Sequence, residues 1–141
     1  MHSIMETHAL AVWGLFSLAL LVLVQSMVAA AAHRRQSSYV PGVVADTLGH
    51  GSFVFRSHRT FLNSLENLPM MAFPSLLALL VGMDAGWLGG LVWTYVGARV
   101  MHMVLYYAIA TEKNPSPRSY FYSVALLANV VLFVKLGLHM L

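Results

Sequence analysis

Four long apolar segments, separated by shorter polar connections, follow one another along the chain. They cover residues 9–32, 57–81, 87–110 and 120–141. As helices with a rise of about 1.5 Å per residue, segments of this length can cross a hydrocarbon core of about 30 Å. The second is apolar only from Leu68 to Val81, so its polar first turns need shielding by protein or a crevice. The pattern predicts a single domain over residues 1–141, an all-α integral membrane protein built as an up-down bundle of four transmembrane helices.

The composition agrees with this prediction and excludes several classes of function. Hydrophobic residues make up 59% of the chain and charged residues 9%, far from the average of soluble proteins. The net charge of +3 comes from residues beside the apolar segments, which favours membrane lipids over nucleic acid as partners. The chain has no cysteine, so any thiol chemistry needs a thiol that a ligand brings.

Basic residues are concentrated in two of the three connections. Six of the eight Lys and Arg lie in or beside the first and third connections, whereas the second carries only Asp84 and the N-terminal segment only Glu6. Because basic loops stay on the cytoplasmic side, we expect both termini to face outward and the two basic connections to face the cytoplasm. In a bacterium, this predicts a multi-pass protein of the inner membrane with a site open to the cytoplasm.

The second segment opens with three strongly polar residues on one side of the predicted helix. These are Arg59, Asn63 and Glu66, whose spacings of four and three place them in one narrow stripe. The opposite face is apolar, through residues such as Phe61 and Leu65. A guanidinium, an amide and a carboxylate together suit a zwitterionic ligand that carries carboxylates and an ammonium group. The alternative is that the Glu66 carboxylate only pairs with a cation on a neighbouring helix and holds the bundle together.

A second polar stripe lies on the third segment. Its members, spaced by four, three and four, are Tyr95, Arg99, His102 and Tyr106. Because the two segments run antiparallel, we expect Tyr106 at the depth of Arg59 to Asn63, and Arg99 near or somewhat below Glu66. This shared depth favours one polar crevice, although Arg99 as a purely structural partner of Glu66 is an equally good interpretation.

Two other kinds of site are weaker interpretations of the same residues. His102 is a candidate metal or haem ligand, but no second histidine shares its depth on a suitable stripe, so we predict no metal. A transport path should continue past Glu66, yet beyond it the second segment offers only Ser75.

The spacing of Arg59, Asn63, Glu66 and Pro69 resembles the R-x-x-x-N-x-x-E-x-x-P signature of the MAPEG family, membrane proteins of eicosanoid and glutathione metabolism. The resemblance covers nearly the whole chain and is to a bacterial member related to microsomal glutathione transferases and leukotriene C4 synthase. It implies a homotrimer that binds glutathione as co-substrate between adjacent subunits near the cytoplasmic face. By resemblance, the residues that bind glutathione are Arg59, Asn63, Glu66 and Tyr106, joined by Arg34 or Arg35 of a neighbouring subunit, with Arg99 and His102 beside them. The chain departs from some relatives at Phe61, Asn67 and His102.

Activation of a thiol in this chain requires a positioned cation or hydroxyl donor, because the thiolate is the nucleophile and the chain has no cysteine. Catalytic relatives use an arginine at the cytoplasmic ends of the third and fourth helices, where this chain has Lys113 and Arg118. We favour Arg118, because Pro117 should begin the fourth helix and leave the guanidinium free to reach back over the crevice. An arginine held at the lipid headgroups is an equally good interpretation of Arg118.

The sequence thus predicts a membrane-bound glutathione transferase, with glutathione peroxidase activity toward lipid hydroperoxides as a possible extension. Its second substrate would be a lipophilic small molecule that enters from the bilayer, because the crevice is polar at its mouth and apolar beside it. The alternative, from a different class, is a non-catalytic protein that binds lipids or acts as a scaffold on the same fold.

Overall fold

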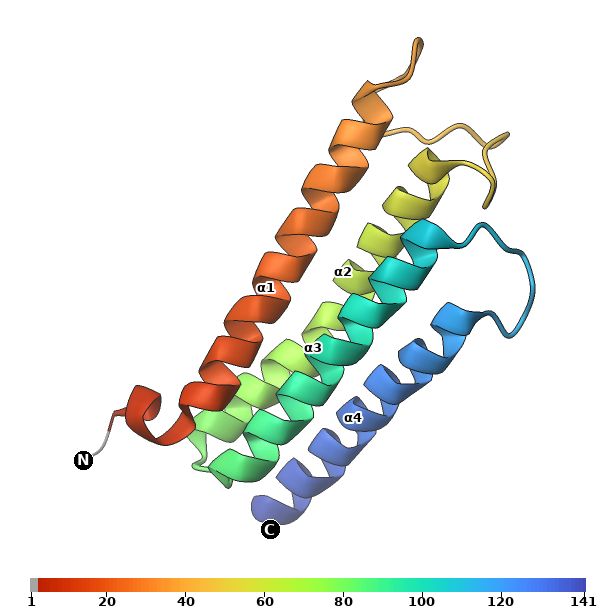
Figure 1. Ribbon diagram of the computed structural model, residues 1–141. Helices are drawn as coiled ribbons and strands as arrows, with labels where there is room; N and C mark the ends of the chain where they lie inside the picture. The colour runs from red at the N-terminus through yellow and green to blue at the C-terminus, as the bar shows by residue number, and fades with distance from the viewer. Residues whose placement is uncertain (1–2) are drawn as a thin grey trace.

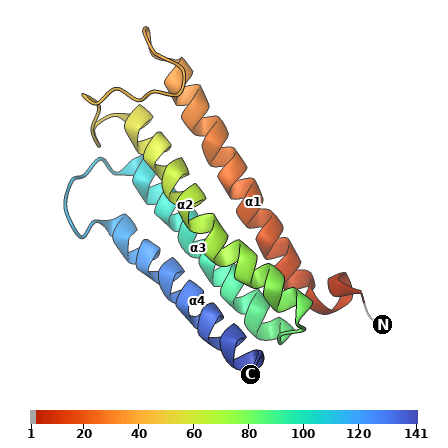
Figure 2. The same cartoon turned by 180° about the vertical axis from the view of Figure 1, so that it is seen from behind.

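The computed structural model describes residues 3–141 as four helices joined in an up-down bundle. They are α1 (Ile4–Arg34), α2 (Phe53–Leu80), α3 (Ala85–Ala108) and α4 (Pro117–His139). Figure 1 shows both termini and the short α2–α3 turn at one end of the bundle, which we call the turn end. The longer α1–α2 and α3–α4 connections lie together at the opposite end, which we call the basic end (Figure 2). The predicted all-helical bundle is confirmed.

Three of the helices, α1, α3 and α4, are long and apolar enough to cross a membrane. With 28 residues, α2 is longer than α3 or α4, but its polar first turns make it less apolar than the three helices that could cross a membrane. This agrees with the expectation that only its second half is apolar. The ribbon nevertheless shows α2 running alongside the other helices over their length (Figure 2). The bundle buries only one side of its polar first turns, the side of Ser57, Thr60, Ser64 and Asn67.

The helix boundaries differ from the expected ones for local reasons. α1 begins five residues early, because Ser3 caps it and the Ser3 side chain and Glu6 form a capping box. The helix then bends at His8, whose φ of −119° and ψ of 25° are not helical, and the first turn stands off the bundle in Figure 1. α4 begins at Pro117, ahead of residue 120, because proline suits the first helical position and Ser116 caps it together with Ser119.

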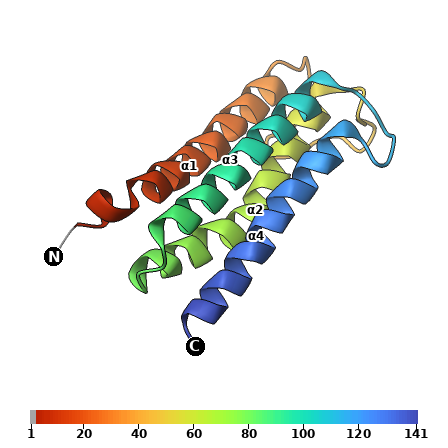
Figure 3. The ribbon, with the colours of Figure 1, turned by 60° about the horizontal axis from the view of Figure 1, so that its bottom comes forward.

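α3 packs against each of the other helices, whereas α1 and α4 do not touch each other within the described chain. Figure 3 shows α3 between α1 and α4 when the bundle is turned to bring its turn end forward. Glycines allow the close approach of α1 and α3: a Cβ on Gly14 would lie 2.6 Å from Val92, and one on Gly89 would lie 2.8 Å from Leu10. Small residues at such contacts are typical of helices that pack within membranes.

The interior is apolar toward the turn end and polar toward the basic end. The apolar part is formed by Ala11, Leu18, Ala78, Leu88, Val92, Leu132 and Leu136. Toward the basic end, buried side chains on α2 and α3 are mostly polar: Ser57, Thr60, Ser64, Asn67, Arg99 and His102. Such a concentration of buried polar groups on one side of a membrane bundle marks a candidate functional site.

Candidate functional site

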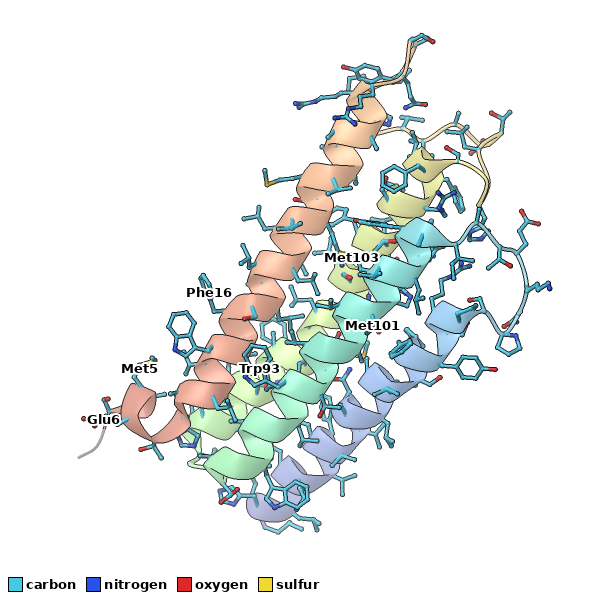
Figure 4. The ribbon with its side chains drawn as sticks, viewed as in Figure 1. Met5, Glu6, Phe16, Trp93, Met101 and Met103 are labelled. Carbon is cyan, nitrogen blue, oxygen red and sulfur yellow. The ribbon has the colours of Figure 1, made fainter. Side chains whose placement is uncertain are left out.

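The polar stripe of α3 forms as predicted. Tyr95, Arg99, His102 and Tyr106 are all buried on the face that α3 turns toward the bundle interior. Met101 and Met103, which flank His102 in sequence and are labelled in Figure 4, are exposed and half-buried, respectively. The periodicity of the sequence therefore identified the buried side of α3 correctly.

Arg99 is the most deeply buried charged residue, with 1% of its surface exposed. One terminal nitrogen, Nη2, donates hydrogen bonds to Asn63 Oδ1 and to Ser64 Oγ, each at 2.8 Å. Nε and Nη1 have no hydrogen-bond partner within residues 3–141. Because both bonds go to α2 residues other than Glu66, the expected Arg99–Glu66 ion pair is not formed within the chain, and that structural interpretation is wrong for the single subunit.

Three contacts fix how α2 and α3 lie against each other. From the basic end inward, Arg56 Nη2 donates to the carbonyl of Tyr107, Arg99 contacts Asn63, and the Tyr95 hydroxyl donates to the carbonyl of Asn67. This register places Arg99 opposite Asn63 and Ser64, two to three residues closer to the basic end than Glu66. The expected depth of Arg99 was off by less than one helical turn, because the spacing of residues within each helix does not determine the register between two helices.

The predicted stripe of α2 points away from the bundle interior. Arg59 and Glu66 are exposed and Asn63 is half-buried, and within residues 3–141 neither Arg59 nor Glu66 forms a hydrogen bond or ion pair. The interior side of α2 is instead a row of small polar residues: Ser57, Thr60, Ser64 and Asn67. A single chain thus joins the two predicted stripes only through Asn63. The apolar side chains of Phe61 and Leu65 do not line the bundle interior. Buried Arg99 and Tyr95 of α3 need polar partners, and the opposite side of α2 provides them.

At the basic end the α3 stripe meets the start of α4. The guanidinium carbon of Arg118 lies 4.0 Å from the centre of the Tyr106 ring, a cation–π arrangement, and Arg118 is half-buried. Arg118 also donates to the carbonyl of Thr111 at 3.4 Å. Lys113, in contrast, is exposed in the α3–α4 connection. Of the two candidate cations, only Arg118 is brought against the predicted site.

Arg34 and Arg35 are both exposed at the end of α1. Arg34 lines a hollow of about 370 Å³ between α1, the α1–α2 connection and α2, whose other walls include His33, His58 and Phe61. Within one chain, this hollow is separate from the Tyr106–Arg118 contact, because α1 packs on α2 and α3 but not on α4.

The structure adds two residues to the site, His50 and Arg56, that the sequence patterns did not predict. His50, in the α1–α2 connection, places its ring 5.7 Å from that of Tyr106. Burial lowers the pKa of the His50 imidazole below its ordinary value of 6.5, and the positive charge of Arg118 lowers it further. Arg56 holds the connection in place by donating to the carbonyl of His50 at 2.7 Å. A histidine between glycines gives no periodic pattern, but the polar row on α2 had one, because Ser57, Thr60, Ser64 and Asn67 follow helical spacing.

The described residues contain no group of three or more His, Asp or Glu side chains arranged to hold a metal ion. The chemistry available at the basic end is therefore that of cations, hydroxyl groups and imidazoles: Arg118 and Tyr106, with His50 and His102 beside them. Such a set can stabilise an anion and accept or donate a proton.

Comparison with known proteins agrees with this architecture. Compared with individual proteins of curated function, the chain has no significant match. The model of the MAPEG family, in contrast, matches residues 10–138, nearly the whole chain and all four helices. Together with the membrane bundle, this match shows that the chain belongs to the MAPEG family, integral membrane proteins of eicosanoid and glutathione metabolism.

Proposed function

We propose that this protein is a trimeric, membrane-bound glutathione transferase, with glutathione peroxidase activity toward lipid hydroperoxides as a further reaction of the same site. The observation that carries the proposal is the placement of Arg118 over Tyr106, where α3 and α4 meet at the basic end. A half-buried guanidinium beside a phenol is suited to hold a thiolate in position.

The exposed stripe of α2 supports a site shared between subunits. Arg59 and Glu66 are exposed in the single chain, and Glu66 directly precedes the apolar half of α2 that begins near Leu68. An unpaired carboxylate facing lipid costs about 2.5–3.5 kcal/mol or more, so a neighbouring subunit or ligand is needed there. In a trimer, the stripe of one subunit would face the Arg34-lined hollow of the next, and glutathione would bind between the two.

Glutathione fits the side chains available at such an interface. Its γ-glutamyl ammonium group would bind the Glu66 carboxylate, and its carboxylates would bind Arg59 and a neighbour's Arg34 or Arg35. Asn63 has its Oδ1 engaged by Arg99, which leaves its amide nitrogen free to donate to a peptide carbonyl. Arg99 therefore acts through Asn63, and His102 acts through its packing on Tyr106. No metal takes part in this proposal.

Arg118 would activate the thiol. A free thiol has a pKa of about 8.5, and only a small part of it is thiolate at neutral pH. Lowering that pKa by one unit requires about 1.4 kcal/mol of preference for the anion, which one positioned guanidinium can supply. The lipophilic electrophile would approach from the bilayer, beside the apolar surface of the helices.

We also infer an orientation from the distribution of charge. Arg34, Arg35, Arg56, Arg59, Lys113 and Arg118 all lie at the basic end, which would face the cytoplasm of a bacterial cell, with both termini outside. Because the chain has no native cysteine, single cysteines at exposed Ser38 and Leu141 can be labelled cleanly. Labelling of Ser38→Cys from outside intact cells would reverse this orientation.

The experiment that tests the function is a titration of purified protein with glutathione while thiolate absorbance is followed. The wild type should bind glutathione and show the thiolate near neutral pH. Arg118→Ala should bind with little change, lose the thiolate signal and turn over at least about tenfold more slowly, since about 1.4 kcal/mol corresponds to a factor of ten. Glu66→Gln should lose about 2–5 kcal/mol of binding free energy, as expected for a buried charged contact.

Lys113→Ala is the matched control, because Lys113 is a neighbouring cation that is exposed to solvent. If Lys113→Ala removes the thiolate signal and Arg118→Ala does not, the catalytic role belongs to Lys113. If glutathione binds to the wild type without a thiolate signal, the lipid-binding or scaffolding alternative is the better description.

A further inference from the structure

The α1–α2 connection brings one histidine to the mouth of the site. The His50 ring lies 5.7 Å from the Tyr106 ring, tilted by 33°, and 5.0 Å from the ring of Phe55. Tyr106 is the residue over which Arg118 stacks, so His50 and Arg118 share one aromatic neighbour. Two chemically active groups, from a loop and from α4, thus meet at the same phenol.

The position of His50 is held by the surrounding chain. Arg56, in the first turn of α2, donates from Nη1 to the carbonyls of His50 and Gly51 at 2.7 and 3.1 Å, and from Nη2 to the carbonyl of Tyr107. A Cβ on Gly49 would lie 3.7 Å from Glu112 Oε1, so the α1–α2 and α3–α4 connections lie side by side here. The backbone at His50 is therefore held by Arg56 to α2 and, through the Tyr107 carbonyl, to α3, and it lies beside the α3–α4 connection.

One ring nitrogen of His50 has no partner. Nδ1 is shielded from solvent and forms no hydrogen bond within residues 3–141. Buried polar atoms in proteins are nearly always bonded, so this nitrogen is available to a group of a ligand that enters the site. With the proton on Nε2, Nδ1 is an acceptor that has nothing to accept.

The charges around His50 keep it neutral before the ligand binds. Burial and then Arg118 lower the pKa of its imidazole, and Arg56 and Arg59 of α2 act in the same direction. Glu112 of the α3–α4 connection opposes them. The ring of Tyr106 on α3 faces the imidazole at 5.7 Å. A neutral imidazole is the form that can accept a proton.

We propose that His50 is a further catalytic residue that accepts the proton of the glutathione thiol, while Arg118 stabilises the thiolate. This inference rests on the proposed glutathione transferase function. The S–H bond breaks, a new N–H bond forms at His50 Nδ1, and the sulfur keeps the electron pair. The result is a thiolate beside an imidazolium, and the charge of that thiolate raises the pKa of the imidazole enough for the proton to stay there.

The same proton completes the reaction. After the thiolate adds to an electrophile, the imidazolium returns its proton to the anion that forms on the product, and His50 is neutral again. The other nearby histidines are less well placed. His58 lines the hollow between α1 and α2, and His102 lies one helical turn deeper than Tyr106, inside the bundle.

The count of protons released to solution distinguishes this role from one played by Arg118 alone. If a guanidinium merely stabilises the thiolate, each thiol that ionises releases one proton to the buffer. If His50 keeps the proton, thiolate appears with clearly less than one proton released. Both quantities can be measured on the full-length protein in detergent, from thiolate absorbance and from calorimetric titration with glutathione in buffers of different ionisation enthalpy.

His50→Gln is the test variant, and His139→Gln is its matched control, because His139 is an exposed histidine at the turn end, away from the proposed site. We expect the wild type and His139→Gln to release well under one proton per thiolate at pH 7. His50→Gln should bind glutathione with nearly unchanged affinity, release about one proton per thiolate, and form thiolate about 100-fold more slowly, the lower end for general base catalysis. His50→Ala should behave like His50→Gln, which separates proton transfer from the volume of the side chain.

Two outcomes would overturn the proposal. One is a proton count and a rate of thiolate formation in His50→Gln equal to those of the wild type. The other is the same loss in His139→Gln, which would indicate a general effect of histidine replacement on the fold. If the wild type itself binds glutathione without forming thiolate, or does not bind it, the proposed function fails, and the role of His50 fails with it.

Discussion

The two halves of the bundle interior use opposite means to hold the same helices together. Toward the turn end, apolar side chains and glycines bring α1 and α3 into close contact, as at Gly14 and Gly89. Toward the basic end, α2 and α3 are joined by hydrogen bonds of Arg99 to Asn63 and Ser64. Apolar side chains need no specific partner when they are buried, whereas each buried polar group needs a hydrogen-bond partner.

The difference extends to the ends of the bundle. At the turn end, His8 and His139 bind the carbonyls of Met83 and Val81, so both outer helices hold the α2–α3 turn. At the basic end, buried side-chain atoms of Arg99, His102 and His50 have no hydrogen-bond partner within residues 3–141, and the same holds for Gln25 and Asn129 nearer the middle of their helices. We infer that the turn-end half contributes most of the stability, and that the unpartnered groups near Tyr106 are available to a ligand.

The largest effect should come from removing the partners of Arg99. In the double variant Asn63→Ala/Ser64→Ala, a buried guanidinium loses both of its acceptors, and the free energy of unfolding should fall by about 3–5 kcal/mol. Unfolding of the protein in mixed micelles of rising dodecyl sulfate content, followed by far-ultraviolet circular dichroism, measures this loss. Ser75→Ala is the control, because Ser75 is fully buried but bonds only to the sulfur of Met71. A similar loss in both variants would contradict the comparison.

A smaller effect is expected where the apolar half is crowded. A Cβ on Gly89 would come within 3.0 Å of three atoms of Leu10, so Gly89→Ala should destabilise the protein by about 1–3 kcal/mol through overpacking. The adjacent Gly90 has no neighbour within 4 Å of such a Cβ, and Gly90→Ala should stabilise α3 by about 0.5–1 kcal/mol. The two variants are compared in the same unfolding assay. If both change stability in the same direction, close approach of α1 and α3 is not what holds this half together.

The histidine contacts at the turn end should each contribute less. His8→Ala removes the bond from Nε2 to the carbonyl of Met83 at 2.9 Å, and a loss of about 1 kcal/mol is expected for one hydrogen bond. His139 is exposed, so water can replace its contact with Val81, and His139→Ala should cost less than His8→Ala. Hydrogen exchange of the amides around residues 81–83 would locate the change. The reverse order of the two variants would show that the turn is held mainly by α4.

The smallest effect should be a dependence on pH at the basic end. Because the folded protein lowers the pKa of His50 below 6.5, the unfolded chain binds a proton there more readily as the pH falls through 6.5. The fold therefore loses stability as the pH falls from 6.5 toward the folded pKa of His50, and the loss stays constant below that pKa. Above pH 6.5 this group has no such effect. Melting of the wild type and His50→Gln at several pH values should show the wild type losing relative stability on acidification. A constant difference between the two would exclude this contribution of His50.

The amino-acid sequence by itself determined the bundle and one side of its site. The length of the four apolar segments requires helices that can cross a membrane, because only helices and closed barrels satisfy their backbone groups in lipid. Helical periodicity also identified the buried stripe of α3 from Tyr95 to Tyr106. These features are local, since they depend on the spacing of residues within one segment.

Only the tertiary structure decided which groups meet. Helical spacing places Arg59, Asn63 and Glu66 on one stripe. In the fold, Ser64 and its neighbours face inward, where Ser64 accepts a hydrogen bond from buried Arg99, and Arg59 and Glu66 remain exposed. The folded connections brought Arg118 to Tyr106 and left Lys113 in solvent. His50 reaches Tyr106 through a loop without periodicity, and its contact joins residues 56 positions apart in the chain. Pairings of this kind depend on the register between helices, and no pattern within a single segment encodes it.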